Sequence, residues 1–314
     1  MTDHAQRILV CDHRGQGIEA RLREISAADF ELRTARSLRE SIERLGSWRP
    51  QLLILDPLTK NAVAEISALT RGEAGPLREN IPVLVILDRD PARDPGEWSK
   101  ELGPRPWDMI DRNASPEELG IRLRQLLGYG RMLMEMGRLR HRAAHDDRTD
   151  LLRPQAFQTR MNEHFAAAKR HQLELCFVMM DLDKFGQINK RHDHTIGDKL
   201  IAKVGEVIRR SLRTEDVAGR LGGDEFAVLL PYTKRDDALQ VVGRLRERIA
   251  NLSGPFEGAD EDIPVSTSIG FETFDGEDLE SVESLRKNAE KALRKAKRSG
   301  GDQAIYYREL DPGN

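Results

Sequence analysis

The chain has 314 residues, enough for about two domains, and its 39% hydrophobic and 33% charged residues are typical of a soluble globular protein. Its longest apolar runs, at 52–55 and 176–180, are too short to cross a bilayer, and residues 1–4 do not begin an apolar signal peptide. A net charge of −3 gives no support for nucleic-acid binding. Cys11 and Cys176 lie inside apolar runs. We therefore expect buried thiols and a cytoplasmic protein with no membrane or nucleic-acid partner.

Short apolar runs that end in an acidic residue recur along the first part of the chain. The first run is 7–12, and later ones end at Asp56, Asp88 and Asp111, with helix-like segments between them. This alternation predicts an α/β domain with a doubly wound parallel sheet over residues 1–125. Because ligands lie beyond the carboxyl ends of the strands in such a sheet, we expect Asp12 and Asp56 to lie near each other.

Residues 116–146 have a helical pattern, and we expect 126–146 to be a linker helix. Apolar side chains lie roughly on one face of this helix: Leu119, Leu123, Leu126, Leu133 and Met136. Gly128 and Gly130 weaken the helix where they interrupt it. Two interpretations stand side by side, a two-stranded coiled coil that joins protomers and a helix packed along its own domain.

Residues 147–314 form the second predicted domain. Apolar periodicity predicts helix 154–171, strand 173–180, helix 195–212, hairpin 217–230, helix 235–249, strand 264–271, helix 279–298 and strand 304–307. This order is typical of an α+β sandwich of the split βαβ type with an antiparallel central sheet.

The centre of this domain is the turn at 222–225, where two glycines and two acids stand between apolar runs. Such a sequence predicts a hairpin with a tight turn. Gly222 and Gly223 can adopt positive φ and carry no Cβ, so a substrate can lie against their backbone. Asp224 and Glu225 present carboxylates, which suit Mg²⁺ held together with nucleotide phosphates. The alternative is an acidic, solvated turn.

A second acidic segment, 179–189, begins with a strand that ends at Asp181. If this strand lies beside the hairpin, Asp181 and Asp224 share one edge of the sheet. Two carboxylates there can bridge Mg²⁺ ions that neutralise phosphate charge and align a hydroxyl with its leaving group. The alternative is that both acids cap turns.

The string Gly-Gly-Asp-Glu-Phe at 222–226, followed by Ala-Val-Leu-Leu-Pro, closely resembles the signature loop of GGDEF domains, the diguanylate cyclases that condense two GTP into cyclic di-GMP. The resemblance extends over residues 146–307. It implies a nucleotidyltransferase that uses Mg²⁺, with Mn²⁺ as an alternative. It also implies an enzyme that is active as a homodimer and inhibited by its product.

The resemblance further implies roles for residues of the two acidic segments. Asp181 and Asp224 are metal ligands, helped by the Leu182 carbonyl. Glu225 lies next to the metals and assists deprotonation of the 3′-hydroxyl. Lys297 matches a lysine that binds the triphosphate.

Base recognition and product inhibition are implied in the same way. Asn189 and Asp198 match the guanine-reading pair, and an aspartate accepts from guanine N1–H and N2–H₂, a pair of donors that adenine lacks. Arg213 and Asp216 match the RxxD motif that binds cyclic di-GMP. Arg244 is a candidate second arginine of that site, with a solvated helical charge as the alternative.

Departures from the family pattern keep a second hypothesis open. Gly186 and Gly301 stand where the family has a lysine and an arginine that contact phosphate, with Lys184 or Arg298 as candidate substitutes. Of the family's Asp-x-Leu-Thr-Gly-Leu motif, the segment 146–151 keeps only the aspartate, the threonine and the last leucine. We favour an active cyclase. The alternatives are a degenerate domain that acts as a cyclic di-GMP receptor and, more weakly, a scaffold.

The first domain resembles a response-regulator receiver, a (βα)5 fold in which a strand-end acid pair binds Mg²⁺ and a central aspartate accepts phosphate. Asp56 stands at the phosphoacceptor position. The acid pair is reduced to Asp12, the switch hydroxyl is replaced by Leu87, and the lysine is replaced by Arg112. We therefore favour a pseudo-receiver used for dimerisation over a phosphorylated switch. A histidine kinase or another signalling protein is the expected type of partner.

Overall fold

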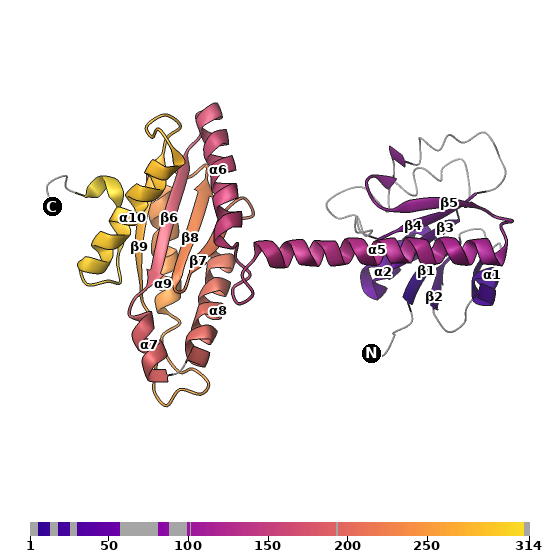
Figure 1. Cartoon of the computed structure of the whole chain (residues 1–314), viewed down its shortest axis with the longest axis horizontal. Helices are drawn as coiled ribbons and strands as arrows, with labels where there is room; N and C mark the ends of the chain where they lie inside the picture. The colour runs from indigo at the N-terminus through magenta and orange to yellow at the C-terminus, as the bar shows by residue number, and fades with distance from the viewer. Residues whose placement is uncertain are drawn as a thin grey trace. The chain divides into compact units, whose positions relative to one another are not determined.

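The computed structural model describes residues 6–12, 18–25, 30–56, 81–87, 99–100, 102–192 and 194–310. They belong to two compact units, Met1–Leu139 and Arg140–Asn314, whose elements are labelled in Figure 1. The division between the units falls inside one continuous helix, α5 (Pro116–Ala144), which also contains most of the predicted linker. No helix within the described ranges is both long and apolar enough to span a lipid bilayer.

The first unit is built on a parallel sheet with strand order β2-β1-β3-β4-β5. Its strands are β1 (Gln6–Asp12), β2 (Phe30–Ala35), β3 (Leu52–Asp56), β4 (Val83–Leu87) and β5 (Trp107–Asp111). The predicted parallel sheet is confirmed. Asp12 and Asp56 are direct register partners on adjacent strands, which confirms that they lie near each other.

Helices α1 (Ile18–Ile25) and α2 (Leu38–Trp48) also belong to the described part of this sheet domain. The sequence analysis did not identify β2 or α2. Strand β2 is an edge strand with alternating exposure and no continuous apolar run, so the pattern of buried strands did not reveal it. Predicted helical segments between β3 and β4, and between β4 and β5, fall largely at 57–80 and 88–98, outside the described residues.

Helix α5 changes character along its length. Leu119, Leu123 and Leu126 are buried in the core of the first unit, so this half packs along its own domain. Beyond Gly130 the apolar side chains are largely exposed, and Met136 is 39% exposed. Leu133 is only partly buried, so the predicted apolar face is buried in the first unit at Leu119, Leu123 and Leu126 but not at Met136.

The second unit carries a five-stranded sheet with order β10-β9-β6-β8-β7. Its strands are β6 (Leu175–Leu182), β7 (Val217–Gly222), β8 (Glu225–Pro231), β9 (Thr267–Phe274) and β10 (Ala304–Tyr306). The central strand β6 is antiparallel to both β8 and β9, but β10 is parallel to β9. The sheet is thus mixed, and the antiparallel prediction is wrong for this edge. The cause is α10 (Val282–Arg298), a crossover helix that returns the chain to the same end of the sheet.

Helices cover both faces of this sheet, as Figure 1 shows. The α6 (Pro154–His171) and α10 helices pack on one face, against alternate residues of β6 such as Phe177 and Met179. The other face carries α8 (His194–Ser211) and α9 (Arg235–Ala250), which pack against the intervening residues. A short helix that the sequence analysis did not predict, α7 (Phe185–His192), follows the end of β6. Strand β6 is therefore buried on both faces of the sheet, and its carboxyl end, which leads into α7, lies at one end of the sheet.

Candidate active site

The acids of the two motifs meet at one edge of the second sheet. Asp181, near the end of β6, is the register partner of Glu225 at the start of β8. The Leu182 amide donates to the Asp224 carbonyl at 3.3 Å, so the backbone of the turn lies against the end of β6. The four residues predicted to surround the metals are therefore neighbours, although they come from segments more than 40 positions apart.

The turn between β7 and β8 is fixed on one side by hydrogen bonds from Arg220 and is open on the side of its two glycines. Gly223 has φ +50°, a conformation that side chains other than glycine adopt with strain. An added Cβ at Gly222 or Gly223 would meet no heavy atom of a described residue within 4 Å, so a ligand has room beside this backbone. Arg220 donates to the Gly223 carbonyl from Nε at 3.0 Å and from Nη2 at 2.7 Å, which fixes the turn.

Asp181 is the most perturbed acid of this edge. Its side chain is buried, and Nζ of Lys297 lies 2.5 Å from its Oδ2. Burial raises the pKa of Asp181, the hydrogen bond from Lys297 lowers it, and the nearby charges of Asp224 and Glu225 raise it again, to about 6. A carboxylate held this way is stabilised by any further cation that approaches the edge.

The donor set fits Mg²⁺ only in combination with a substrate. Among the described residues, no three His, Cys, Asp or Glu side chains gather closely enough to hold an ion by themselves. Mg²⁺ is usually bound by one or two carboxylates together with phosphates and water. Asp181, Asp224 and the Leu182 carbonyl supply that kind of partial shell, so the site suits an ion that arrives with phosphate.

The predicted base-reading residues lie on two consecutive helices. An added Cβ at Gly197 would lie 1.8 Å from Oδ1 of Asn189, so the Asn189 side chain rests on the α8 backbone next to Asp198. That oxygen is buried and has no hydrogen-bond partner among the described residues. Oδ2 of Asp198, in contrast, forms an ion pair with Nη2 of Arg148 at 2.9 Å. The two predicted readers are thus close together, but only Asp198 has a charged partner.

Two functional contacts of the loop before α6 escaped the sequence analysis. Asp146 accepts hydrogen bonds from Thr149 Oγ1 at 2.8 Å and from Arg220 Nη1 at 3.1 Å. Since Arg220 also holds the Gly223 carbonyl, this loop is tied to the acidic turn. The position of Arg220 two residues before the signature string was the signal that could have revealed this role, whereas at Arg148 the sequence showed only a departure from the family's leucine.

The glycines at the two missing phosphate contacts have different surroundings. No heavy atom of a described residue lies within 4 Å of an added Cβ at Gly186. At Gly301, with φ +79°, an added Cβ would lie 2.9 Å from Oδ1 of Asp183. Lys184 and Arg298 are exposed and form no ion pair with other described residues, so both cations are available to a ligand.

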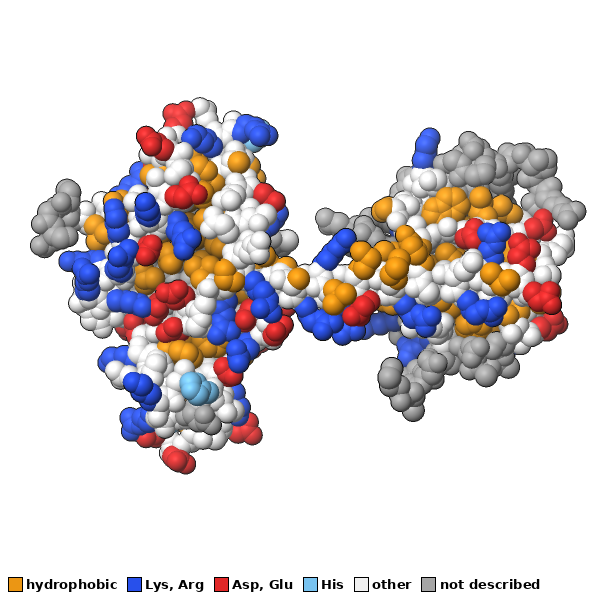
Figure 2. Space-filling view, in the orientation of Figure 1, with side chains coloured by type: hydrophobic (Ala, Val, Ile, Leu, Met, Phe, Trp, Pro, Cys, Tyr) orange, Lys and Arg blue, Asp and Glu red, His pale blue; other side chains and the backbone are white. Residues whose placement is uncertain are grey.

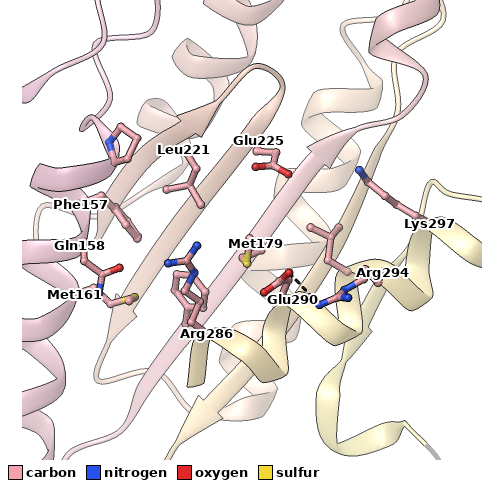
Figure 3. Close-up of a pocket in the computed structure, with 13 residues that line it drawn as sticks. Phe157, Gln158, Met161, Met179, Leu221, Glu225, Arg286, Glu290, Arg294 and Lys297 are labelled. Atoms are coloured by element: carbon pink, nitrogen blue, oxygen red, sulfur yellow. Dashed lines mark hydrogen bonds and ion pairs between the residues drawn. The ribbon is translucent and has the colours of Figure 1, made fainter. Parts of the chain in front are cut away.

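A cavity of about 390 Å³ adjoins this edge on the face covered by α6 and α10. Figure 3 shows Glu225 and Lys297 toward one end, with Arg286, Glu290 and Arg294 farther along α10. Of the predicted site residues, only Glu225 and Lys297 line it. The cavity is therefore a neighbour of the acidic edge, and the base-reading residues lie outside it.

The predicted product site lines a separate pocket of about 380 Å³. Arg213 and Asp216 both line it, and the Arg213 amide donates to Oδ2 of Asp216 at 2.8 Å. Burial raises the pKa of Asp216. Arg244 is outside the lining and donates to the Ser211 carbonyl at 3.2 Å, while Arg209 lines the pocket.

Asp56 of the first unit is buried, and a cation from its own chain occupies it. Arg112 donates to both carboxylate oxygens of Asp56, with Nη1 2.7 Å from Oδ2. The neighbouring Asp12 is also buried and lies 3.6 Å from Nη1 of Arg36. The arginine that stands in for the expected lysine thus binds the predicted phosphoacceptor directly.

Comparison with known proteins gives a context for the second unit. Residues 143–303 match the family described as diguanylate cyclase, GGDEF domain. The chain is 34% identical over 164 residues to the diguanylate cyclase DgcP of Pseudomonas aeruginosa, which covers 52% of this chain and 24% of DgcP. It is 31% identical over 233 residues to the diguanylate cyclase TpbB of the same species, which covers 73% of this chain and 51% of TpbB. The chain spans about a quarter and about half, respectively, of the length of these curated relatives.

Solved structures agree with the sequence relatives. The coiled coil and GGDEF domain of DgcB from Caulobacter crescentus, in complex with c-di-GMP, aligns with a TM-score of 0.55 and 26% identity, covering 60% of this chain and 98% of that one. The diguanylate cyclase SiaD of Pseudomonas aeruginosa, in complex with its activator SiaC, aligns with a TM-score of 0.50 and 28% identity, covering 60% and 72%.

Proposed function

The chain belongs to the GGDEF family, and on this premise we propose that it is a diguanylate cyclase, a nucleotidyltransferase that condenses two GTP into cyclic di-GMP. The observation that carries the proposal is the acidic edge, where Asp181, Asp224 and Glu225 come together beside a turn with an open outer face. This arrangement supports metal-assisted phosphoryl chemistry better than turn capping, since capping does not require a buried acid with a raised pKa.

Asp181, Asp224 and the Leu182 carbonyl are the residues that would hold Mg²⁺, with Mn²⁺ as an alternative. The ion would supply charge neutralisation at the phosphates and align the 3′-hydroxyl with the pyrophosphate leaving group. Lys297 keeps Asp181 paired in the absence of substrate and can turn to the triphosphate when it binds. Glu225 lies across the strand pair from Asp181, where it can accept the proton of the attacking hydroxyl.

Guanine would be read by Asn189 and Asp198. The unpartnered Oδ1 of Asn189 supports this, because an orphaned buried acceptor costs free energy that a donor on the base would recover. Asp198 would accept from N1–H and N2–H₂. Adenine lacks that donor pair, so we expect a strong preference for GTP.

Condensation needs two active sites that face each other, and we propose that α5 pairs with a second copy. Tyr129, Met132, Met136 and Leu139 are spaced three, four and three residues apart, and each is between 39% and 53% exposed. Figure 2 shows hydrophobic side chains at the surface of this helix. A row with this spacing is the a/d seam of a two-stranded coiled coil.

Two regulatory features complete the proposal. Product would bind at Arg213 and Asp216, and the pocket between them and Arg209 supports this. The first unit would act as a pseudo-receiver, because a carboxylate whose two oxygens both accept from Arg112 is a weaker nucleophile and would have to give up part of that ion pair to attack a phosphoryl donor. Acetyl phosphate should therefore leave Asp56 unmodified.

The decisive experiment is turnover of GTP by protein freed of cyclic di-GMP. With Mg²⁺ we expect cyclic di-GMP by chromatography, and we expect Asp224→Ala to abolish it while circular dichroism stays unchanged. Asp237→Ala, an exposed acid on α9, is the matched control. Equal turnover by Asp224→Ala would refute the metal-ligand assignment. No product from the parent, together with cyclic di-GMP binding that Arg213→Ala removes, would establish the receptor alternative, which the glycines at 186 and 301 favour.

A further inference from the structure

We propose that Arg148 is a gate on the guanine site: its guanidinium occupies Asp198 until guanine displaces it. The inference rests on the proposed function, since it takes Asp198 as a reader of the base. It goes beyond that function because Arg148 belongs to none of the predicted sites. Arg148 itself departs from the family's Asp-x-Leu-Thr-Gly-Leu motif, which has a leucine at this position.

The geometry of the pair is that of a direct contact between an arginine and an acid. Nη2 of Arg148 lies 2.9 Å from Oδ2 of Asp198, and the two side chains are 52% and 48% exposed. Arg148 stands in a short loop that is closed at its base, where the Arg153 amide donates to the Ala144 carbonyl and the Asp146 amide to the Leu151 carbonyl, both at 2.7 Å. The loop therefore holds Arg148 at the guanine site as part of the fold.

The chemistry of the pair resembles that of the complex it would precede. A guanidinium presents parallel N–H donors to a carboxylate, and the N1–H and N2–H₂ groups of guanine present the same kind of donor edge. Oδ2 of Asp198 is therefore paired with Arg148 before any base arrives. Asn189, the other predicted reader, has an unpartnered oxygen in the same structure. Of the two predicted readers, Asp198 is therefore the one that already has a cation as its partner.

The cost of opening the gate sets the size of the effect. Both partners are about half exposed, and exposed ion pairs contribute little, so displacing Arg148 should weaken GTP binding by only about two- to fivefold. The pair acts before chemistry and touches none of the reacting atoms. We therefore expect it to change the affinity for GTP and the KM, and to leave kcat unchanged.

The test is equilibrium binding of a GTP analogue with a non-cleavable α,β-methylene bridge to product-free protein with Mg²⁺. Arg148→Leu should bind the analogue about two- to fivefold more tightly than the parent, and Arg148→Lys should fall between them. The difference between Arg148→Leu and the parent should shrink as salt rises, because salt screens the ion pair that the variant lacks. Arg160→Leu is the matched control, since Arg160 is an equally exposed arginine paired with Glu163 at 2.8 Å.

Asp198→Ala separates failure of the gate from failure of the proposed function. If Asp198→Ala weakens analogue binding and Arg148→Leu in that background has no further effect, the two residues act through each other, as we infer. If Asp198→Ala weakens binding but Arg148→Leu alone leaves it equal or weaker, the gate is wrong and guanine reading by Asp198 stands. If Asp198→Ala leaves binding unchanged, the base-reading role itself is wrong, and the gate with it.

Discussion

Each of the two units carries acids at the ends of adjacent strands, but the two acidic edges are neutralised in different ways. In the first unit, Asp56 gives both oxygens to Arg112, and Asp12 lies near Arg36. In the second unit, Asp181 is paired through one oxygen with Lys297, while burial and the nearby charges of Asp224 and Glu225 raise its pKa. The first edge is closed by its own chain, and the second is left short of positive charge.

The chemistry of the two cations explains why this difference matters. A guanidinium is planar and binds a carboxylate through two parallel hydrogen bonds, so it competes well with a metal ion for the same oxygens. An ammonium is a point charge on a flexible stem and can exchange one partner for another. Strand-end acids alone therefore do not make a metal site. The counter-ion decides whether the oxygens are available.

Neutralising one acid at each edge tests this difference directly. We expect Asp181→Asn to lower cyclic di-GMP formation by about a thousandfold, because it removes a carboxylate that would hold Mg²⁺ at the phosphates. Asp56→Asn, the matched change at the other edge, should leave turnover per folded molecule unchanged. Turnover is measured with saturating GTP and Mg²⁺. Similar losses in both variants would show that the two edges do not differ in function.

Removing the counter-ion tests the closed edge. Arg112→Ala leaves Asp56 as a buried carboxylate without its bidentate partner, and we expect the first unit to lose about 3 kcal/mol of unfolding free energy in urea. Arg112→Lys should recover part of this loss. Mg²⁺ should stabilise Arg112→Ala more than the parent, since the oxygens of Asp56 become available to a cation. A variant as stable as the parent would show that Arg112 does not neutralise this edge.

Much of the site could be predicted from sequence because it follows from local rules. Strand ends, the glycine turn and their acids are marked by apolar runs and by glycine, so the approach of Asp181 to the turn at Asp224 was foreseeable. The split fold of the second unit was foreseeable for the same reason. The parallel edge strand β10 was missed because strand direction depends on the path of α10, which periodicity does not record.

The contacts that decide whether an acidic side chain is available to a ligand could not be predicted in this way. Arg148 and Asp198 are 50 positions apart with no shared motif, and Arg112 and Asp56 are 56 apart, where the receiver resemblance gave their positions but not their ion pair. Whether an arginine side chain turns toward an acid depends on the packing around it, and each chain of this composition offers many charged pairs. The sequence therefore predicted which acids gather, whereas the cations that occupy them emerged only from the structure.

A smaller effect is expected at Asp146, in the loop before α6, whose hydrogen bonds with Thr149 and Arg220 tie this loop to the acidic turn. Burial acts to raise the pKa of Asp146, but hydrogen bonds from Thr149 and Arg220 outweigh it, and the net pKa is lowered from 3.8. Its ionised form therefore stabilises the fold above that pH, and this stability is lost as the pH falls through the lower folded pKa.

We accordingly expect Asp146→Asn to cost about 2 kcal/mol of unfolding free energy at pH 7. The gap between variant and parent should close as the pH falls below 3.8, where the parent becomes protonated as well. Urea unfolding at several pH values measures this. A gap that widens toward acid would mean that the carboxylate is strained in the fold.

The smallest expected effect concerns the exposed half of α5, which would bring two open edges together. Replacing both Met132 and Met136 by lysine places like charges on the seam of each helix, so we expect the dissociation constant of the dimer to rise about tenfold or more. Met134→Lys is the matched control, because Met134 is 43% exposed on the same helix but outside the three-four-three row.

Sedimentation equilibrium measures the dimer, and turnover should fall in parallel at protein concentrations below the new dissociation constant. If Met134→Lys is as disruptive as the double variant, general charge on the helix and not the seam controls assembly. If neither variant changes assembly, the two active sites must be brought together by surfaces other than α5.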